Sequence, residues 1–347
     1  MKMDVNKNLS TQRIVWIDWA KTILIASVCV GHFSPPEIQK LLIWGCHMPA
    51  FFFISGYLYK RHKAWQTIIS FVIPVVFYSS IIFGVHIIKD IVKIGYWDYM
   101  LDFYHPWYRM FGQFFIRIHN NPYGDIPIMG IWFVIALLTC RLLSGDIKKF
   151  TFVLRYRYVV LIVLLIWLTI EPIIWDYIPL KDVKFYYGIY ALPFFLLGYI
   201  IKDLDVRIER LHFISILIVA FAYCSITLNL QRFEMLHYQC GPTYMVFFVC
   251  AMFGSLVLFW ICTKLPRLKI VEVFSIGTLL ILLLHKELDF FIRPVFHLMG
   301  LTPTTTYIGA SLLPWFEVVL EFIIFYYPIL WLNSHFPILW EKYLRDE

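Results

Sequence analysis

WIDWAKTILIASVCVGHF, residues 16–33, and HMPAFFFISGYLYK, residues 47–60, decide how this chain folds. The first stretch is largely apolar and carries two charged residues, Asp18 and Lys21, and one histidine, His32. At about 100° per residue, the eleven positions from Lys21 to His32 complete three turns of an α-helix, so both side chains share one face and stand roughly 16 Å apart. Because a charge inside a membrane is costly, we expect Asp18 and Lys21 to face the interior of a helix bundle and to offset each other.

The composition is that of a membrane protein. Of the 347 residues, 61% are hydrophobic and 15% are charged, whereas a soluble domain has roughly 45–50% apolar and about 25% charged residues. A membrane span needs about 20 apolar residues. The stretches that meet this requirement are residues 14–33, 41–59, 66–88, 126–144, 158–175, 185–201, 211–229, 242–262, 269–289 and 311–333. We therefore predict an all-α, polytopic membrane bundle of about ten transmembrane helices, forming a single domain over residues 1–347.

The basic residues predict how the bundle is oriented. With the N-terminus in the cytoplasm, 18 of the 30 Lys and Arg residues fall on the cytoplasmic side and 10 on the other. Cytoplasmic loops carry an excess of basic residues, so we expect both termini in the cytoplasm and the chain in the inner (cytoplasmic) cell membrane. The net charge of +7 follows from this topology, and no soluble domain is left over to bind nucleic acid. The seven cysteines have no zinc-like spacing, so we predict neither a disulfide nor a metal.

The two opening stretches resemble the acyltransferase 3 family of integral membrane O-acyltransferases, and within it the fucose 4-O-acetylase-like branch. The family's first motif, a basic residue, ten intervening residues and a histidine, falls on Lys21 and His32. Its second, SG followed by an aromatic residue, falls on residues 55–57. Family members often carry two arginines three apart just after it, where this chain has KRHK at residues 60–63, and Lys21 stands where arginine is more usual.

The resemblance implies an acyl-CoA-dependent O-acyltransferase. Such an enzyme would transfer acetyl, or another short acyl group, across the membrane to a sugar hydroxyl of a surface polysaccharide or glycoconjugate. Its partners would be acetyl-CoA as acyl donor, a carbohydrate acceptor and the surrounding membrane lipid. A histidine suits the base that takes the hydroxyl proton, and the motif and the helix geometry both assign that role to His32.

Two more histidines are predicted at the depth of His32. In the expected orientation, His47 lies just below the external surface and His285 lies in the external third of its span. Either one would orient His32 or the acceptor, with Glu171 or Asp289 as its partner. The alternative for each is a histidine near a helix end whose ring bonds a backbone carbonyl. Trp132 and Glu171 belong to the same layer and are candidates for binding the acceptor.

The other end of the first helix is basic, and we expect the phosphates of coenzyme A to dock there. The candidate donor-binding residues are Lys21, Ser55, Lys60, Arg61, Lys63 and Arg141. Three alternatives remain open. The cluster at 60–63 would serve topology alone, Lys21 would only fix helix packing through Asp18, and the small residues at 55–56 would only allow two helices to approach closely.

Two further features have competing interpretations. The connection 89–125 is rich in aromatic residues and reads as an interfacial helix pair broken at Pro106. Its aromatic residues, Trp107 among them, serve either as a membrane anchor or as a platform for a sugar ring. Glu317 and Glu321 share a helix face and form either a proton path or the lining of a polar cavity.

The main competing function is a transporter or flippase for a glycan or lipid, in which the intramembrane charges line the translocation path. Transporters usually show two repeated halves with matching broken helices, and this sequence shows no internal repeat. A structural assembly partner is the third possibility. The motifs at Lys21, His32 and residues 55–57 favour the acyltransferase.

Overall fold

In the residues it describes, the computed structural model is helical apart from one two-stranded hairpin and the connecting turns. These residues are 13–33, 35–94, 130–145, 152–174, 185–230, 233–235, 238–298, 307–336 and 339. The helices are α1 (Val15–His32), α2 (Glu37–Trp44), α3 (His47–Tyr57), α4 (Ala64–Ile94), α6 (Ile131–Ser144), α7 (Phe152–Arg155), α8 (Arg157–Ile174), α9 (Tyr186–Asp203), α10 (Phe213–Leu230), α11 (Tyr244–Cys262), α12 (Lys269–Ile276), α13 (Thr278–Leu298) and α14 (Tyr307–His335). A 3-10 turn, η3 (Ile208–Arg210), precedes α10, and strands β1 (Phe233–Glu234) and β2 (Gln239–Cys240) pair antiparallel before α11.

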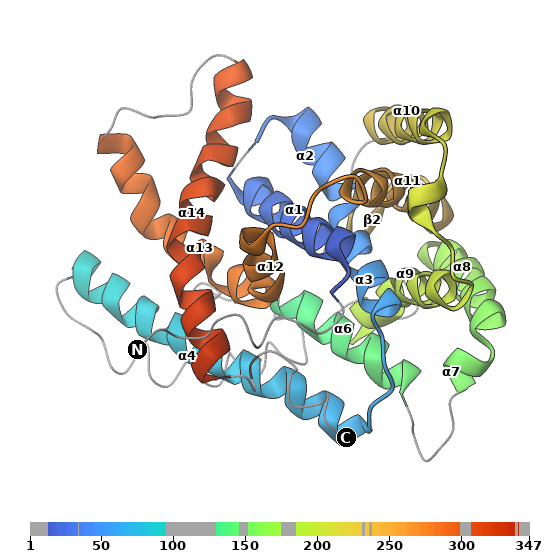
Figure 1. Ribbon diagram of the computed structural model, residues 1–347, viewed down its shortest axis with the longest axis horizontal. Coiled ribbons are helices and arrows are strands. Elements are labelled where there is room, and N and C mark those ends of the chain that lie inside the picture. Colours follow the sequence, from blue (N-terminus) through green and yellow to red (C-terminus); the bar gives the residue numbers. More distant parts are fainter. Residues whose placement is uncertain are drawn as a thin grey trace.

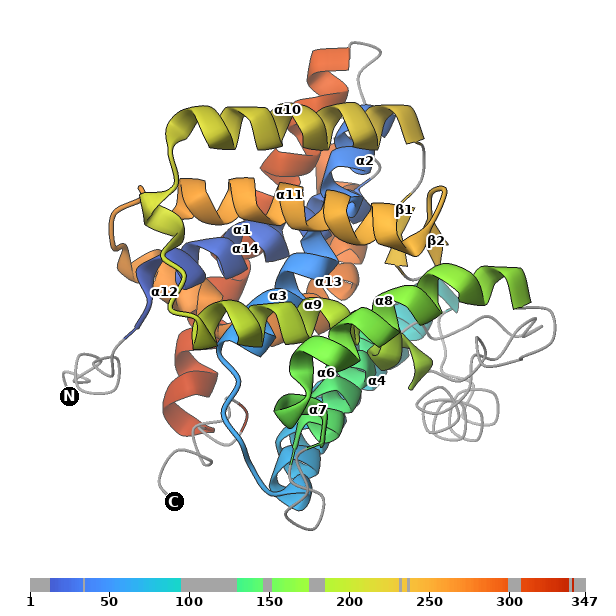
Figure 2. The same ribbon diagram turned by 90° about the vertical axis from the view of Figure 1, so that its right-hand side faces the viewer.

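Helix α1 lies near the middle of the molecule (Figure 1). It packs against α12, α13 and α14 on one side and against α3 and α11 on the other. The first motif therefore occupies a helix that is surrounded by others, which is where an intramembrane charge is tolerated. From α1 outwards, α11 is followed by α10, and α3 is followed by α9 (Figure 2).

The predicted spans agree with the helices. Each of the ten predicted stretches coincides with one helix or with two consecutive helices. Among the described residues, four segments are long and apolar enough to cross a membrane: Val15–His32, Ala64–Ile82, Tyr244–Cys262 and Gly309–His335. These results confirm an all-α, multi-pass membrane protein, while the total of ten spans and the side of the termini stay predictions.

Two predicted spans are broken helices. The stretch 41–59 divides into α2 and α3 at residues 45–46, and the stretch 269–289 divides into α12 and α13 at Gly277. At Gly277 a Cβ would overlap the Ile329 side chain of α14, so this break is also a point of close helix contact. Because an apolar run gives no sign of an internal break, sequence periodicity did not predict either one.

The outer helices turn apolar side chains away from the bundle. On α10, Ile214 and Phe221 are 71% and 75% exposed, and on α8 Val159, Ile162 and Val163 are all exposed. A soluble protein rarely shows so large an apolar surface, whereas a lipid-facing helix has one by necessity. The exposed faces therefore support the membrane assignment independently of the hydropathy count.

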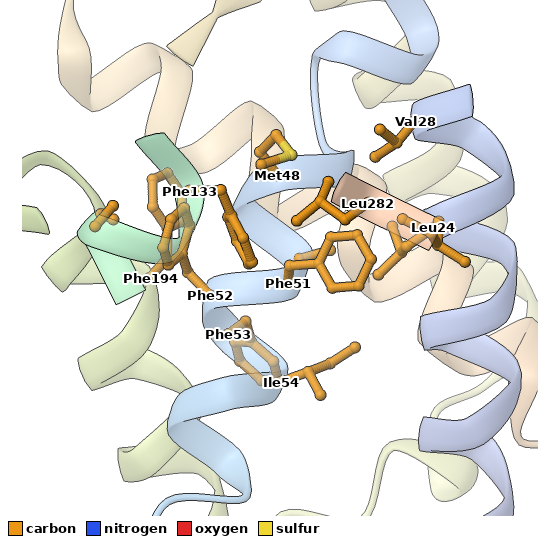
Figure 3. Packing of buried hydrophobic residues seen from close by; sticks show 14 of the residues in the cluster. Leu24, Val28, Met48, Phe51, Phe52, Phe53, Ile54, Phe133, Phe194 and Leu282 are labelled. Atoms are coloured by element: carbon orange, nitrogen blue, oxygen red, sulfur yellow. The ribbon is translucent and has the colours of Figure 1, made fainter. Parts of the chain in front are cut away.

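The interior joins α1 to α3 through aromatic and aliphatic packing (Figure 3). Phe51 of α3 and Leu282 of α13 point towards Leu24 of α1, while Phe52 packs against Phe133 of α6 with ring centroids 4.8 Å apart. Each of these side chains is buried. The packing places the beginning of α3, at His47, at the end of the bundle where α1 finishes.

Candidate active site

The central feature of the site is a pair of histidines from opposite ends of the chain. His32 is the last residue of α1, and His285 lies in the second turn of α13. Their ring centroids are 5.2 Å apart, and the ring planes are inclined by 31°. The family motif indicated only His32, and the structure brings His285 into contact with it.

The surroundings of His285 fix which nitrogen carries the proton. Its Nδ1 lies 3.0 Å from the carbonyl oxygens of both Ile281 and Leu282. Because a carbonyl oxygen only accepts hydrogen bonds, Nδ1 has to be the donor, and a neutral ring then leaves its lone pair on Nε2. His285 is 1% exposed, and Nε2 has no hydrogen bond in the described part of the chain. The backbone contact raised as the alternative reading for His285 is thus present, and it leaves Nε2 available for chemistry.

His47 has a similar backbone contact. Its Nδ1 lies 2.8 Å from the Ile43 carbonyl oxygen, across the break between α2 and α3. His47 and Lys286 both lie within electrostatic range of His32. The three predicted histidines therefore gather around the end of α1, where the His32 ring is half-buried.

A group of acidic residues lies near Cys29 of α1. Glu321 of α14 is 0% exposed, and neither carboxyl oxygen has a well-formed hydrogen bond among the described residues. The Cys29 thiol lies beside that carboxyl, and Asp289 and Glu317 are within electrostatic range of it. Cys29 is one turn before His32, and Asp289 is one turn after His285. Glu321 thus lies within reach of residues one helical turn from each histidine, and the proton path and the polar-cavity lining both stay open as interpretations of Glu317 and Glu321.

The charged residues of α1 turn towards α12. The Ser275 hydroxyl donates a hydrogen bond to Asp18 Oδ1 at 2.5 Å, and Lys21 Nζ donates to the Ser275 carbonyl oxygen at 3.5 Å. Asp18 Oδ2 also lies 4.0 Å from Arg13 Nη1. We expected Asp18 and Lys21 to offset each other. In the structure, both side chains form a hydrogen bond with Ser275 of α12, which links them.

The predicted donor-binding cations lie towards the beginning of α1. Trp16, in the first turn of α1, packs edge-on against Tyr57 at the end of α3, with centroids 5.4 Å apart. The segment that follows carries Lys60, Arg61 and Lys63, all exposed. Lys60 also lies within electrostatic range of Lys202 at the end of α9, where partial burial and, to a smaller extent, the charge of Lys60 lower the pKa of Lys202.

Arg141 and the small residues of the second motif have defined packing contacts. Arg141, in the last turn of α6, lies 5.2 Å from the Phe71 ring, and its carbonyl oxygen accepts a hydrogen bond from the Tyr59 hydroxyl at 3.4 Å. A Cβ at Gly56 would overlap the Phe195 carbonyl oxygen of α9. The close approach of two helices therefore accounts for the glycine beside Ser55.

Trp132 and Glu171 belong to a cluster of tyrosines. Trp132 packs against Tyr187 at 5.5 Å, and Tyr187 stacks on Tyr238 of the hairpin at 4.8 Å with a 5° interplanar angle. Glu171 is buried beside the Tyr186 hydroxyl. The start of α6 contacts α13 at Leu282, one turn before His285. The two helices are so close there that a Cβ at Gly130 (φ +86°) would lie 2.8 Å from the Leu282 Cγ.

Several of these residues were missed by sequence analysis. They are Cys29, Tyr187, Lys202, Tyr238 and Ser275. The double tyrosine before Gly188 was a visible signal, whereas nothing in an apolar helix marks Ser275 as the partner of Asp18. Trp107 lies outside the described residues. Within those residues, no group of three or more His, Cys, Asp or Glu side chains is arranged to hold a metal ion.

Comparison with known proteins identifies the family of the chain. A family model described as an acyltransferase domain matches residues 14–339, which is nearly the whole chain. No curated protein and no solved structure matches it significantly. The matched region begins at the first residue before α1 and contains every helix described above. The chain therefore belongs to the acyltransferase 3 family and is a membrane acyltransferase.

Proposed function

We propose that the protein transfers an acetyl or other short acyl group from acyl-CoA, across the membrane, to a sugar hydroxyl of a surface polysaccharide or glycoconjugate. The observation that carries this proposal is the contact between His32 and His285, at the end of a helix whose other end holds Lys21. The two ends of that helix offer different chemistry, an imidazole pair and an ammonium group, about 16 Å apart.

The donor binds from the side on which α1 begins. The phosphates of coenzyme A pair with Lys21 and with the exposed Lys60, Arg61 and Lys63, and Lys202 adds a fifth cation there. Arg141 and Ser55 line the same end of the bundle. The pantetheine arm then runs along α1 and brings the thioester to the histidines, which requires an extended chain of about 16 Å.

The acceptor binds at the end where α1 finishes. Trp132 and the tyrosines packed behind it offer aromatic faces for a sugar ring. Glu171, buried next to Tyr186, offers a carboxyl oxygen for a sugar hydroxyl. Trp107, which lies outside the described residues, stays a sequence-based candidate for binding the acceptor.

Transfer is a proton-coupled displacement at the thioester. His32 takes the proton of the acceptor hydroxyl while the hydroxyl oxygen attacks the carbonyl carbon. The tetrahedral intermediate then expels the coenzyme A thiolate by breaking the C–S bond, and the thiolate takes the proton from His32. His285 and His47 orient His32 and the acceptor, because their Nδ1 atoms are held by the backbone. In the alternative order, a His32 nitrogen attacks the thioester and the C–S bond breaks with release of the coenzyme A thiolate; the sugar hydroxyl then takes the acyl group, and the acyl–nitrogen bond to His32 breaks.

The test is transfer of label from radiolabelled acetyl-CoA to candidate glycans by the purified protein. We expect His32→Ala to lower kcat by about 10²- to 10⁴-fold, since that is the usual contribution of a general base. His212→Ala, at an exposed histidine before α10, is the matched control and should leave the rate unchanged. Undiminished transfer by His32→Ala would refute the role of His32, and glycan movement across vesicles without any transfer would support a transporter instead.

A further inference from the structure

Helix α1 touches the α12–α13 pair at two levels. At the lower level, Asp18 and Lys21 contact Ser275, in the last turn of α12. At the upper level, His32 contacts His285 of α13. Thr22 adds a hydrogen bond at the lower level, from its hydroxyl to the Val271 carbonyl oxygen at 3.1 Å.

The two levels are a similar number of residues apart on both partners. Eleven residues separate Lys21 from His32 on α1, and ten separate Ser275 from His285. The stretch on α1 is one continuous helix of about 16 Å, whereas the stretch from Ser275 to His285 crosses the break at Gly277. The two contacts occur in the same order along both partners, so α1 and the α12–α13 pair run in the same direction.

Ser275 is placed at the joint between the two short helices. It lies two residues before the break at Gly277 and is buried. Its carbonyl oxygen accepts hydrogen bonds from Lys21 Nζ at 3.5 Å and from Thr278 Oγ1, the first residue of α13, at 2.9 Å. A cation is favourable there, because the last carbonyls of a helix carry partial negative charge. One residue thus links α1, the end of α12 and the start of α13.

We propose that Ser275 is a positioning residue that fixes the register of α13 against α1 and so holds His285 beside His32. A slip of one helical turn moves a side chain by about 5.4 Å, which is as large as the 5.2 Å between the ring centroids. The catalytic consequence rests on the proposed function, whereas the register itself does not.

The kinetic test compares Ser275→Ala with Ser275→Thr. Loss of the hydroxyl should lower kcat on the order of ten- to a hundredfold, because a misplacement of about 1 Å can reduce a rate that much. The KM for acyl-CoA should stay within about twofold, and Ser275→Thr, which keeps the hydroxyl, should restore the rate. Helix α12 remains attached in these variants through Thr22 and through the Arg13–Glu272 ion pair at 3.7 Å. Ser255→Ala is the matched control, since this buried serine bonds only the Ala251 carbonyl of its own helix.

A second measurement reads the register without catalysis. In the double variant His32→Cys, His285→Cys, a short bifunctional methanethiosulfonate should link the two positions, and mass spectrometry of the linked peptides separates this product from those of the native thiols. Adding Ser275→Ala to this double variant should reduce the yield of the cross-linked product severalfold, whereas adding Ser255→Ala should leave that yield unchanged. Native kcat together with an unchanged yield would overturn the proposal. A reduced yield with undiminished transfer in Ser275→Ala would support the register and refute the catalytic role of the histidine pair.

Discussion

At the scale of single residues, the two nitrogens of His285 have different roles: Nδ1 bonds the backbone, and Nε2 is available to the reaction. Substitutions can test these roles separately. Asparagine places an amide nitrogen near the position of Nδ1 and keeps the bond to the backbone, whereas glutamine reaches the position of Nε2. We expect His285→Asn to lose about a hundredfold in kcat while its thermal unfolding temperature in detergent stays close to that of the parent. His285→Gln should retain more activity. An equal loss in both variants would show that Nε2 has no role of its own.

Lys21 is the second residue with a separable prediction. Lys21→Arg keeps the positive charge and the donors that reach the Ser275 carbonyl, so activity should be retained. Lys21→Ala removes both and should chiefly raise the KM for acyl-CoA, because one phosphate loses its cation. Steady-state kinetics with varied acyl-CoA measures the difference. If alanine and arginine impaired the enzyme equally, a role for the charge would be ruled out.

At the scale of helices, the contact between α3 and α9 depends on two glycines that face each other's backbone. A Cβ at Gly56 overlaps the Phe195 carbonyl oxygen, and a Cβ at Gly198 overlaps the Phe53 carbonyl oxygen. A backbone oxygen cannot rotate away as a side chain can, so the helices have to separate. Gly56→Ala should therefore destabilise the protein by about 1–3 kcal/mol.

The matched control for Gly56→Ala lies on α4. A Cβ at Gly84 meets nothing within 4 Å among the described residues, so Gly84→Ala should be neutral or stabilising by up to about 1 kcal/mol through helix propensity. Thermal unfolding of the purified protein in detergent compares the two variants. Similar unfolding temperatures for both would mean that α3 and α9 adapt to the added methyl group.

The helix scale also marks the limit of prediction from sequence. The predicted span 14–33 differs from α1 by one residue at each end, because an apolar run between polar residues defines both limits. The predicted spans 41–59 and 269–289 gave no sign of their breaks. Each break coincides with a close tertiary contact: Gly277 lies against Ile329, and Gly45 lies beside Tyr223, whose hydroxyl donates to the Leu42 carbonyl.

At the scale of the whole molecule, the count of basic residues predicts which segments face the cytoplasm. The turn that follows α9 should be cytoplasmic and the hairpin before α11 external. Val206→Cys and Pro242→Cys place a thiol at an exposed position in each. In intact cells, a membrane-impermeant maleimide should label Pro242→Cys but should label Val206→Cys only after lysis. The reverse pattern would invert the proposed sides of donor and acceptor.

The sequence by itself determined that the chain is a helical membrane protein of this acyltransferase family, and that Lys21 and His32 share a face of its first helix. Those features depend on composition, hydropathy and spacing within one helix, which are local properties. The tertiary structure alone decided that His285 lies against His32, and that Asp18 and Lys21 meet at Ser275, 257 and 254 residues away along the chain. Contacts at that separation depend on how α12 and α13 pack on α1, and helical periodicity within either segment carries no information about the register between them.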